Sequence, residues 1–307
     1  MKTKTTAGGA VRAKAGALRV MEFPFVVKVP EGYVRRVVRE ALREDLSEGD
    51  VTTELSVDRA ARASAVFKLK DDGVVAGFEA ARAVFAVLDP ATRVNFEVDE
   101  GMWCVKGTVV AGVRGRAWSI LSGERVALNF MQRLSGVATM TRRFVEEVSG
   151  TGVRILDTRK TTPNLRLLEK QAVALGGGYN HRPSLSSLAL IKDNHIRAAG
   201  SVTKAVELLR AAGPRVLVEV EVAPDADLAE LATVDADILM FDNWPADRLK
   251  QAIRKARYFP RRPLIEVSGR IRLDNVRRIA LCGPDFISVG YITHSAAALD
   301  ISLDLEP

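Results

Sequence analysis

The chain has 307 residues, 47% of them hydrophobic, which is enough to bury a large core in one large domain or two unequal ones. Lys and Arg number 45 against 38 Asp and Glu, and the net charge of +7 favours anionic partners, either nucleic acids or small phosphorylated or carboxylated metabolites. Aromatic residues make up only 6%, which argues against a nucleic-acid partner, and no apolar run is long enough to cross a membrane.

The first 135 residues are predicted to form a leader and a small α+β domain. Residues 1–20 contain no acidic residue and are rich in Lys, Arg, Thr and Ala, which predicts a disordered basic leader. The domain, residues 21–135, opens with a helical apolar repeat from Val34 to Leu42 and a turn over 47–53. Short apolar runs then predict strands, with one helix among them at 80–88; the strands are expected at 65–69, 74–76, 94–98 and 109–113.

A long helix is predicted next, with Ser122 as its cap. This assignment puts Arg125 in the first helical turn, where a cation opposes the helix dipole by about 0.3–1 kcal/mol. A ligand anion nearby would offset that cost. The alternative is an arginine that simply points to solvent.

After this helix the pattern changes to alternating strands and helices, and predicts a βα barrel over residues 136–290. The apolar runs recur about every 20 to 35 residues, the repeat of such a barrel. They lie at 153–156, 188–191, 216–220, 238–241, 264–267 and 286–289. The carboxyl-terminal segment, 291–307, is expected to pack back on the amino-terminal domain.

The residues that follow these strands are candidates for the active site, because a βα barrel carries its chemistry on the carboxyl-terminal rim. Cations come first along the chain, then carboxylates, then small residues; the set is Arg159, Lys160, Lys192, Glu219, Glu221, Asp242, Ser268, Gly269 and Gly290. Small residues with free backbone N–H groups suit a phosphate. Carboxylates suit ribose hydroxyls, Mg²⁺ or a developing carbocation. Alternation puts Glu219 and Glu221 on one strand face, and an ion pair inside the barrel is the other interpretation for one of them.

Several classes of protein are disfavoured by what the chain lacks. Only three histidines occur, which makes a multi-histidine metal site implausible. No nucleophile elbow, Walker loop or dinucleotide fingerprint follows a predicted strand, so we expect no hydrolase, NTPase or dehydrogenase and no organic cofactor. Cys104 and Cys282 lie far apart in apolar surroundings, which predicts free thiols and a cytoplasmic location.

The motifs at the predicted strand ends are similar, in content and order, to those of a known family. They are Gly123-Glu124-Arg125, Asp157-Thr158-Arg159-Lys160-Thr161-Thr162-Pro163, Gly176-Gly177-Gly178, Asn180-His181-Arg182, Lys192-Asp193-Asn194-His195, Val218-Glu219-Val220-Glu221-Val222 and Asp242-Asn243. From about Val34 to Leu303 the chain closely resembles quinolinate phosphoribosyltransferase, also called nicotinate-nucleotide pyrophosphorylase. The resemblance implies an α/β fold: an incomplete βα (TIM-like) barrel with an α+β amino-terminal sandwich domain. It also implies a homodimer, or a higher oligomer of dimers, in which each amino-terminal domain covers the other subunit's barrel.

The resemblance further implies the reaction of NAD biosynthesis that joins quinolinate to 5-phosphoribosyl-1-diphosphate, with Mg²⁺, and releases diphosphate and CO₂. The residues implied to bind the quinolinate carboxylates are Arg159, His181, Arg182 and Lys192, with Arg125 of the partner subunit. Those implied to be catalytic are Lys160, Glu221 and Asp242, the two carboxylates lying near Mg²⁺ without being assigned as direct ligands. Further substrate-binding positions are Thr158, Ser268, Gly269, Arg270 and Gly290, of which Ser268, Gly269 and Gly290 would hold the 5′-phosphate.

Two residues depart from the family pattern, and two other functions stay open. Asn164 and Arg270 stand where the family usually has glycine; Asn tolerates the left-handed backbone, whereas Arg270 either adds a phosphate contact or obstructs one. One alternative is a paralogue of the same fold that acts on another anionic base, such as nicotinate, although a single carboxylate needs fewer cations. The other is a non-catalytic anion or nucleic-acid binder, which leaves Glu221 and Asp242 unexplained.

Overall fold

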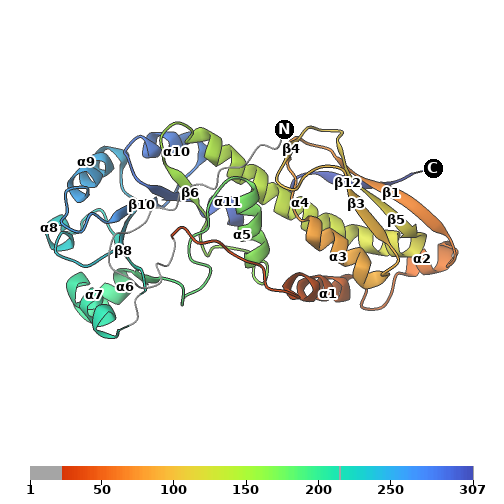
Figure 1. Ribbon diagram of the computed structural model, residues 1–307, viewed down its shortest axis with the longest axis horizontal. Helices are drawn as coiled ribbons and strands as arrows, with labels where there is room; N and C mark the ends of the chain where they lie inside the picture. Colours follow the sequence, from red (N-terminus) through yellow and green to blue (C-terminus); the bar gives the residue numbers. More distant parts are fainter. Residues whose placement is uncertain (1–22, 214–215, 307) are drawn as a thin grey trace, which may run out of the picture.

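Two sheets of different type lie at opposite ends of one long helix, α4 (Ala117–Glu147), in an elongated molecule (Figure 1). This computed structural model describes residues 23–213 and 216–306, so the leader expected at residues 1–20 lies outside the described residues. The boundary expected between residues 135 and 136 falls inside α4, which is unbroken there. None of the described helices combines the length and apolarity that a bilayer crossing requires.

The amino-terminal part is built on an antiparallel sheet of order β12-β1-β5-β3. Its strands are β1 (Arg62–Leu69), β3 (Arg93–Phe96), β5 (Val109–Arg116) and β12 (Ile301–Leu305), and a small ladder joins β2 (Gly73–Val74) to β4 (Trp103–Cys104). Three helices accompany them: α1 (Tyr33–Asp45), α2 (Val51–Ser56) and α3 (Phe78–Leu88). Because β12 pairs with β1, from Leu69↔Ile301 to Ala65↔Leu305, the end of the chain supplies an edge strand of the first domain's sheet.

Two local predictions in this part were wrong, and Asp50 takes part in the contacts that explain both. The expected turn over 47–53 runs into α2, because the Asp50 carboxylate accepts a hydrogen bond from the Thr53 N–H (3.0 Å) and caps that helix. Ser122 does not cap α4, which begins at Ala117 directly after β5; its hydroxyl donates to Asp50 at 2.8 Å instead. Arg125 therefore lies beyond the first turn, and the expected conflict with the helix dipole is absent.

The carboxyl-terminal part is a parallel six-stranded sheet of order β6-β11-β10-β9-β8-β7, and each strand matches one predicted apolar run. The strands are β6 (Arg154–Leu156), β7 (Ala189–Ile191), β8 (Val218–Val222), β9 (Ile238–Asp242), β10 (Leu264–Ser268) and β11 (Phe286–Ser288). The helices are α5 (Arg166–Leu175), α6 (Asp193–Ala199), α7 (Val202–Ala211), α8 (Leu228–Leu231), α9 (Ala246–Ala256), α10 (Leu273–Ala280) and α11 (Tyr291–His294). Strands β6 and β7 end the sheet, so the incomplete βα barrel is confirmed.

The chain fills the open edge of this barrel with segments that come before and after α5. Tyr179 makes a parallel bridge with Leu156 of β6, and Asn180 makes an antiparallel bridge with Phe25. The Phe23 ring packs edge-on against Phe286, with ring centroids 5.0 Å apart. It belongs to a separate apolar cluster inside the barrel, with Leu156, Leu188, Ile238 and Phe286.

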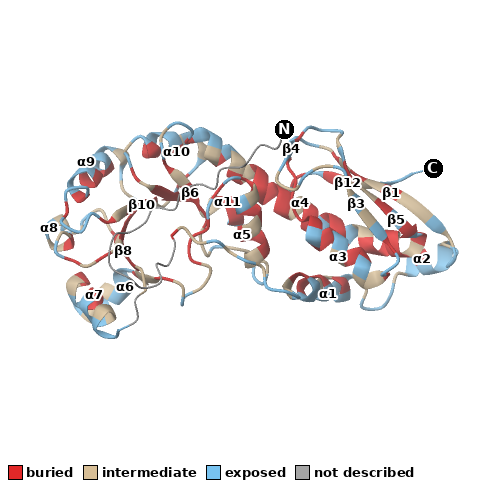
Figure 2. Cartoon of the chain, viewed as in Figure 1, coloured by how far each residue is buried: buried red, intermediate tan, exposed pale blue. Residues whose placement is uncertain are grey.

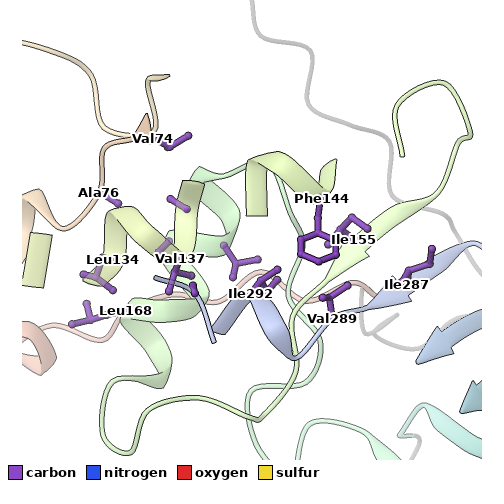
Figure 3. Close-up of a cluster of buried hydrophobic side chains, with 14 of the residues drawn as sticks. Val74, Ala76, Leu134, Val137, Phe144, Ile155, Leu168, Ile287, Val289 and Ile292 are labelled. Atoms are coloured by element: carbon purple, nitrogen blue, oxygen red, sulfur yellow. The ribbon is translucent and has the colours of Figure 1, made fainter. Parts of the chain in front are cut away.

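Helix α4 connects the two parts through buried apolar contacts. Figure 2 shows buried residues along most of α4 and on the inner sides of the surrounding helices. Its residue Leu134 lies near Leu168 of α5, and Phe144 near Ile155 of β6, in the core drawn in Figure 3. All four side chains are at most 3% exposed. The two parts therefore share one continuous core, which holds the barrel firmly relative to the first sheet.

Candidate active site at the barrel rim

The carboxyl ends of the parallel strands bring five of the predicted residues to one rim. Lys192 follows β7, Asp242 ends β9 and Ser268 ends β10, while Glu221 lies in β8 and Gly290 follows β11. Ser268 and Asp242 are register partners on neighbouring strands. The strand order thus arranges a cation, two carboxylates and two small residues along one arc.

The cation and one carboxylate of this arc are paired. The Lys192 ammonium forms an ion pair with Glu221 Oε2, and the Lys192 side chain is 48% exposed against 16% for Glu221. Lys192 is also the N-cap residue of α6. Its backbone N–H donates a hydrogen bond to Nδ1 of the His195 ring at 3.0 Å. The ammonium therefore lies between a carboxylate and solvent, where it can also meet an incoming anion.

The loop after β10 requires glycine at 269. Gly269 has a φ of 92°, and a Cβ there would lie 2.4 Å from Asn243 Oδ1. Asn243 donates its backbone N–H to Ser268 O at 3.0 Å and its side-chain amide to Asp242 Oδ2 at 2.5 Å. Arg270 also has a positive φ, 52°, which costs a non-glycine residue about 1–2 kcal/mol, and its side chain is exposed.

Lys160 lies at the other end of the rim, against the start of α11. A Cβ on Gly290 would lie 3.1 Å from Lys160 Cδ and 3.2 Å from His294 Nε2. The Thr293 hydroxyl donates to Lys160 O at 2.7 Å. Burial and the charges of Lys160 and Arg272 lower the pKa of His294. This corner is therefore cationic and suits a phosphate.

Sequence reasoning gave no role to His294 or Arg272. The only sequence signal for His294 was its position close to Gly290 in the chain. Arg272 is the N-cap residue of α10, and the sequence did not indicate this because arginine is not among the residues preferred at N-caps. Arg272 stacks on the Tyr291 ring, 4.4 Å from its centroid, and this contact brings the end of β10 next to α11.

A buried network supports the loop that carries Lys160. Fully buried Glu169 accepts hydrogen bonds from the Thr162 N–H (3.1 Å) and from Arg133 Nε (3.0 Å) and Nη2 (2.8 Å). Arg133 also donates to the carbonyl oxygens of Thr293 and Ala296. The loop after β6 is thus tied both to α4 and to the segment after β11. The Thr158 hydroxyl accepts the Lys160 N–H at 3.0 Å, so Thr158 shapes the same loop.

Beneath Arg159 a second buried network is fully hydrogen-bonded. Lys170 makes an ion pair with Asp157 and donates to His181 O at 2.9 Å. Asp157 accepts further hydrogen bonds from the Asn180 side chain and the His181 N–H, both at 2.8 Å. Burial raises the pKa of Asp157 and lowers that of Lys170, against the attraction between the two charges.

His181 lies deeper than the rim, and both of its ring nitrogens face protein groups. Nδ1 accepts the Arg182 N–H at 2.8 Å, while Nε2 lies 3.0 Å from Glu219 Oε2 and 3.4 Å from Glu266 Oε2. Glu219 is therefore the interior member of the pair on β8, and Glu221 is the member at the rim. Glu266 was not among the predicted site residues. It lies within an apolar run, and the sequence of that run does not show that the Glu266 side chain faces the barrel interior and meets His181.

Two arginines near His181 are incompletely paired. Arg182 is 7% exposed and donates from Nη1 to Leu188 O at 2.9 Å; Arg159 has a buried Nε without a hydrogen-bond partner among the described residues. Burial and the charge of Arg159 lower the pKa of Arg182, and Glu219 opposes this. Two adjacent guanidinium groups with unused donors suit a ligand with carboxylates.

Arg125, unlike the other predicted site residues, lies outside the barrel. It is exposed on α4, beside the amino-terminal sheet, and makes no hydrogen bond or ion pair with another described residue. The remaining predicted residues form a site with cations at both ends and carboxylates between them. Such a site can bind two anionic reactants and stabilise positive charge that develops where they meet.

Comparison with known proteins gives consistent matches over most of the chain. Family descriptions for the N-terminal and C-terminal domains of quinolinate phosphoribosyl transferase match residues 50–135 and 137–304. A nicotinate-nucleotide pyrophosphorylase (carboxylating) from Mycobacterium leprae is 38% identical over 277 residues, 88% of this chain and 96% of that protein. A quinolinate phosphoribosyltransferase (decarboxylating) from Nicotiana tabacum is 37% identical over 302 residues, 92% and 86% of the two chains. The solved structure of a nicotinate-nucleotide pyrophosphorylase from Francisella tularensis is 38% identical, with a TM-score of 0.86 over 91% of this chain and 98% of that one.

Proposed function

The chain belongs to the quinolinate phosphoribosyltransferase family, and from this premise we propose that its rim carries out that reaction with the residues described above. In this reaction of NAD biosynthesis, quinolinate and 5-phosphoribosyl-1-diphosphate give nicotinate mononucleotide, and diphosphate and CO₂ are released. The observation that carries the residue assignment is the pair of incompletely satisfied guanidinium groups, Arg159 and Arg182, in a barrel whose rim carries Glu221 and Asp242.

Quinolinate carries two carboxylates on adjacent ring carbons. In our proposal Arg159 and Arg182 bind them with planar, bidentate hydrogen bonds, and Lys192 adds a third charge. Lys192 must then exchange some of its contact with Glu221 for the substrate. His181 has no ring nitrogen free for the ligand, so we assign it to support and not to direct binding, which revises the role implied by the resemblance.

The phosphoribosyl donor occupies the rest of the rim. Lys160 meets phosphate oxygens, and the backbone near Ser268, Gly269 and Gly290 takes the 5′-phosphate, since a side chain at 269 or 290 would collide with its neighbours. The exposed Arg270 side chain leaves that backbone open. As diphosphate departs, positive charge develops on the sugar, and Glu221 and Asp242 stabilise it.

Decarboxylation needs no dedicated nucleophile. Bonding of the ring nitrogen to the sugar gives a pyridinium, which accepts the electron pair of the breaking C–C bond as the adjacent carboxylate leaves as CO₂. The protein's contribution is to hold the departing carboxylate and the ring in one geometry while excluding other anions. A proton then replaces the carboxylate on the ring.

Mg²⁺ fits the carboxylates of this rim. Glu221 and Asp242 lie on neighbouring strands, each with oxygen atoms near the rim, and carboxylate oxygens are ligands that Mg²⁺ prefers. Bound with the donor, the ion would neutralise part of the diphosphate charge. We expect it to be held jointly by these two residues and the donor.

A homodimer completes the proposed site. Arg125 is exposed near the start of α4, whereas Phe144 near the end of that helix packs in the core with Ile155 of the barrel, which supports a contribution of Arg125 to the partner's site. Mixing Arg125→Ala subunits with Lys160→Ala subunits should restore one intact site per heterodimer and raise activity well above both parents. Confirmed subunit exchange without that rise would contradict the shared site and leave Arg125 to its own subunit's barrel or to a structural role alone. A cytoplasmic location is also proposed, supported by the free thiols of Cys104 and Cys282.

The assay that tests the reaction is CO₂ release from carboxyl-labelled quinolinate with the diphosphate donor and Mg²⁺. We expect turnover that requires all three components. Nicotinate in place of quinolinate is the control: it lacks the carboxylate that leaves as CO₂, so turnover of both bases is compared by diphosphate release. Faster turnover with nicotinate, or none with quinolinate, would contradict the proposal.

A further inference from the structure

Two carboxylates in the barrel interior have no use in the reaction described so far. Glu219 and Glu266 are both 0% exposed. Apart from the close approach of His181 Nε2, at 3.0 and 3.4 Å, no described side chain or backbone group donates to any of their four oxygen atoms. Burying two unpaired like charges costs several kcal/mol, so their presence in the core asks for a reason other than stability.

Their position on the strands places them below the rim residues. Side chains alternate along a strand, so Glu219 points the same way as Glu221 two residues later, and Glu266 the same way as Ser268. The acid pair, as we call Glu219 and Glu266, therefore forms the layer beneath the rim. Phe286 is the register partner of Glu266 on β11 and packs against Phe23, so an apolar cluster lies beside the pair, and the Phe23 ring lies 5.6 Å from the His181 ring.

The side-chain contacts of the acid pair reach the quinolinate half of the site, although the same strands also carry Glu221 and Ser268 of the donor half. His181 contacts both carboxylates through Nε2 and receives the Arg182 N–H through Nδ1. Glu219 also attracts the Arg182 guanidinium. Lys160 and its supporting residue Glu169 belong to the separate network that reaches α4.

We propose that Glu219 and Glu266 are positioning residues for quinolinate: they fix the His181 ring and, through it and by direct attraction, hold Arg182 where it binds the dicarboxylate. This inference rests on the proposed function. The pair provides a negative surface on the inner side of Arg182, so the guanidinium stays charged in a buried place and keeps its outer donors for the substrate.

Protonation of this cluster is consistent with that role. Burial lowers the pKa of His181, but the charges of Glu266 and Glu219 outweigh it and raise the pKa to about 10. Burial and the charge of Glu266 raise the pKa of Glu219. In the hydrogen-bond pattern seen here Nδ1 accepts from the Arg182 N–H, so the ring carries one proton, on Nε2, facing the acid pair; the second proton that the raised pKa favours would have to displace the Arg182 N–H from Nδ1.

The same three side chains also have the spacing of a cation site, since their ligand atoms lie within 4.8 Å of one another. Two observations favour the positioning role. The His181 ring is already committed through Nδ1 to the backbone of a substrate-binding arginine, and every group is buried, which leaves no open position for a reacting ligand.

The test replaces each carboxylate with its neutral isostere, Glu219→Gln and Glu266→Gln, and measures quinolinate and donor binding separately by calorimetry. We expect the quinolinate Kd to rise by about tenfold, the scale at which supporting residues tune a binding group. Donor Kd should stay within about twofold, and the Tm should stay equal or rise because a buried charge is relieved. Glu169→Gln is the matched control: it removes an equally buried carboxylate and should weaken the donor side instead.

Three results would overturn the inference. One is a quinolinate Kd within twofold of wild type in both variants. Another is parallel weakening of both ligands together with a lower Tm, which is what a purely structural role predicts. The third is stoichiometric Zn²⁺ or Mn²⁺ binding by the substrate-free wild type that Glu219→Gln abolishes. Wild-type protein that neither binds quinolinate nor releases CO₂ would instead contradict the proposed function.

A second measurement uses the unaltered enzyme and is independent of variant folding. The ¹⁵N signals of His181 should show a ring that keeps its Nε2 proton from pH 6 to 9, without a titration near the ordinary value of 6.5. A ring that titrates near that value contradicts the inference.

Discussion

The barrel contains two buried ionic groups on either side of His181, and they differ in how completely their charges are paired. Asp157 and Lys170 form an ion pair with every polar atom hydrogen-bonded. The acid pair, Glu219 and Glu266, has only the His181 ring. A fully satisfied pair holds the fold around the loop after β6. A pair without hydrogen-bond partners lowers the stability of the fold, and such departures are typical of functional sites.

The largest effect should come from breaking the satisfied pair. Lys170→Met leaves Asp157 buried and uncompensated, so we expect the free energy of unfolding to fall by about 3–5 kcal/mol. Urea unfolding measures it. The double variant Asp157→Asn/Lys170→Met should recover part of the loss. If the single variant were as stable as wild type, the contrast between the two groups would disappear.

The next effect concerns the cation that the acid pair supports. Arg182→Ala should weaken quinolinate binding by about 2–5 kcal/mol, because it removes one partner of a largely desolvated charge pair. Calorimetry gives this value, and donor binding should be unchanged. Exposed Arg197 on α6 offers a matched control, Arg197→Ala, which should bind both ligands normally. Unchanged quinolinate affinity in Arg182→Ala would remove Arg182 from the site.

The acid pair should also appear in the pH dependence of stability. The folded-state pKa of His181, about 10, exceeds its ordinary value of 6.5, so its stabilising contribution is complete below 6.5 and is lost as pH rises toward 10. Each such proton contributes a slope of up to about 1.4 kcal/mol per pH unit. The double variant Glu219→Gln/Glu266→Gln should therefore lose less stability between pH 7 and 9 than wild type. If the unfolding free energy of the double variant fell with pH as steeply as that of wild type, the acid pair would not raise the pKa of His181 as described.

The smallest effect should follow removal of the leader, which leaves the apolar cluster beside the acid pair intact. A chain that begins at Met21 keeps Phe23 and its contact with Phe286, so its unfolding free energy should change by less than about 0.5 kcal/mol. Urea unfolding and the CO₂ assay check this. Loss of dimerisation or activity would show that residues 1–20 are not dispensable.

The sequence by itself determined the barrel and its rim. Six apolar runs of strand length, separated by helical repeats, leave few other folds, and parallel strands end at one edge whatever their exact packing. For that reason Lys192, Asp242 and Ser268 were predicted to lie on one rim from chain position alone. The incomplete closure came from the resemblance and not from the apolar pattern.

The tertiary structure alone decided which polar residues meet in the interior. Strand alternation predicted that Glu219 and Glu221 share a strand face. Only the structure shows that Glu219 is buried against His181 while Glu221 lies at the rim and pairs with Lys192. Ser122 resembled a helix cap because local sequence does not show that Asp50, distant in the chain, takes its hydroxyl. Glu266 stayed unnoticed inside an apolar run. Partners of buried charges are set by long-range packing, which local periodicity does not encode.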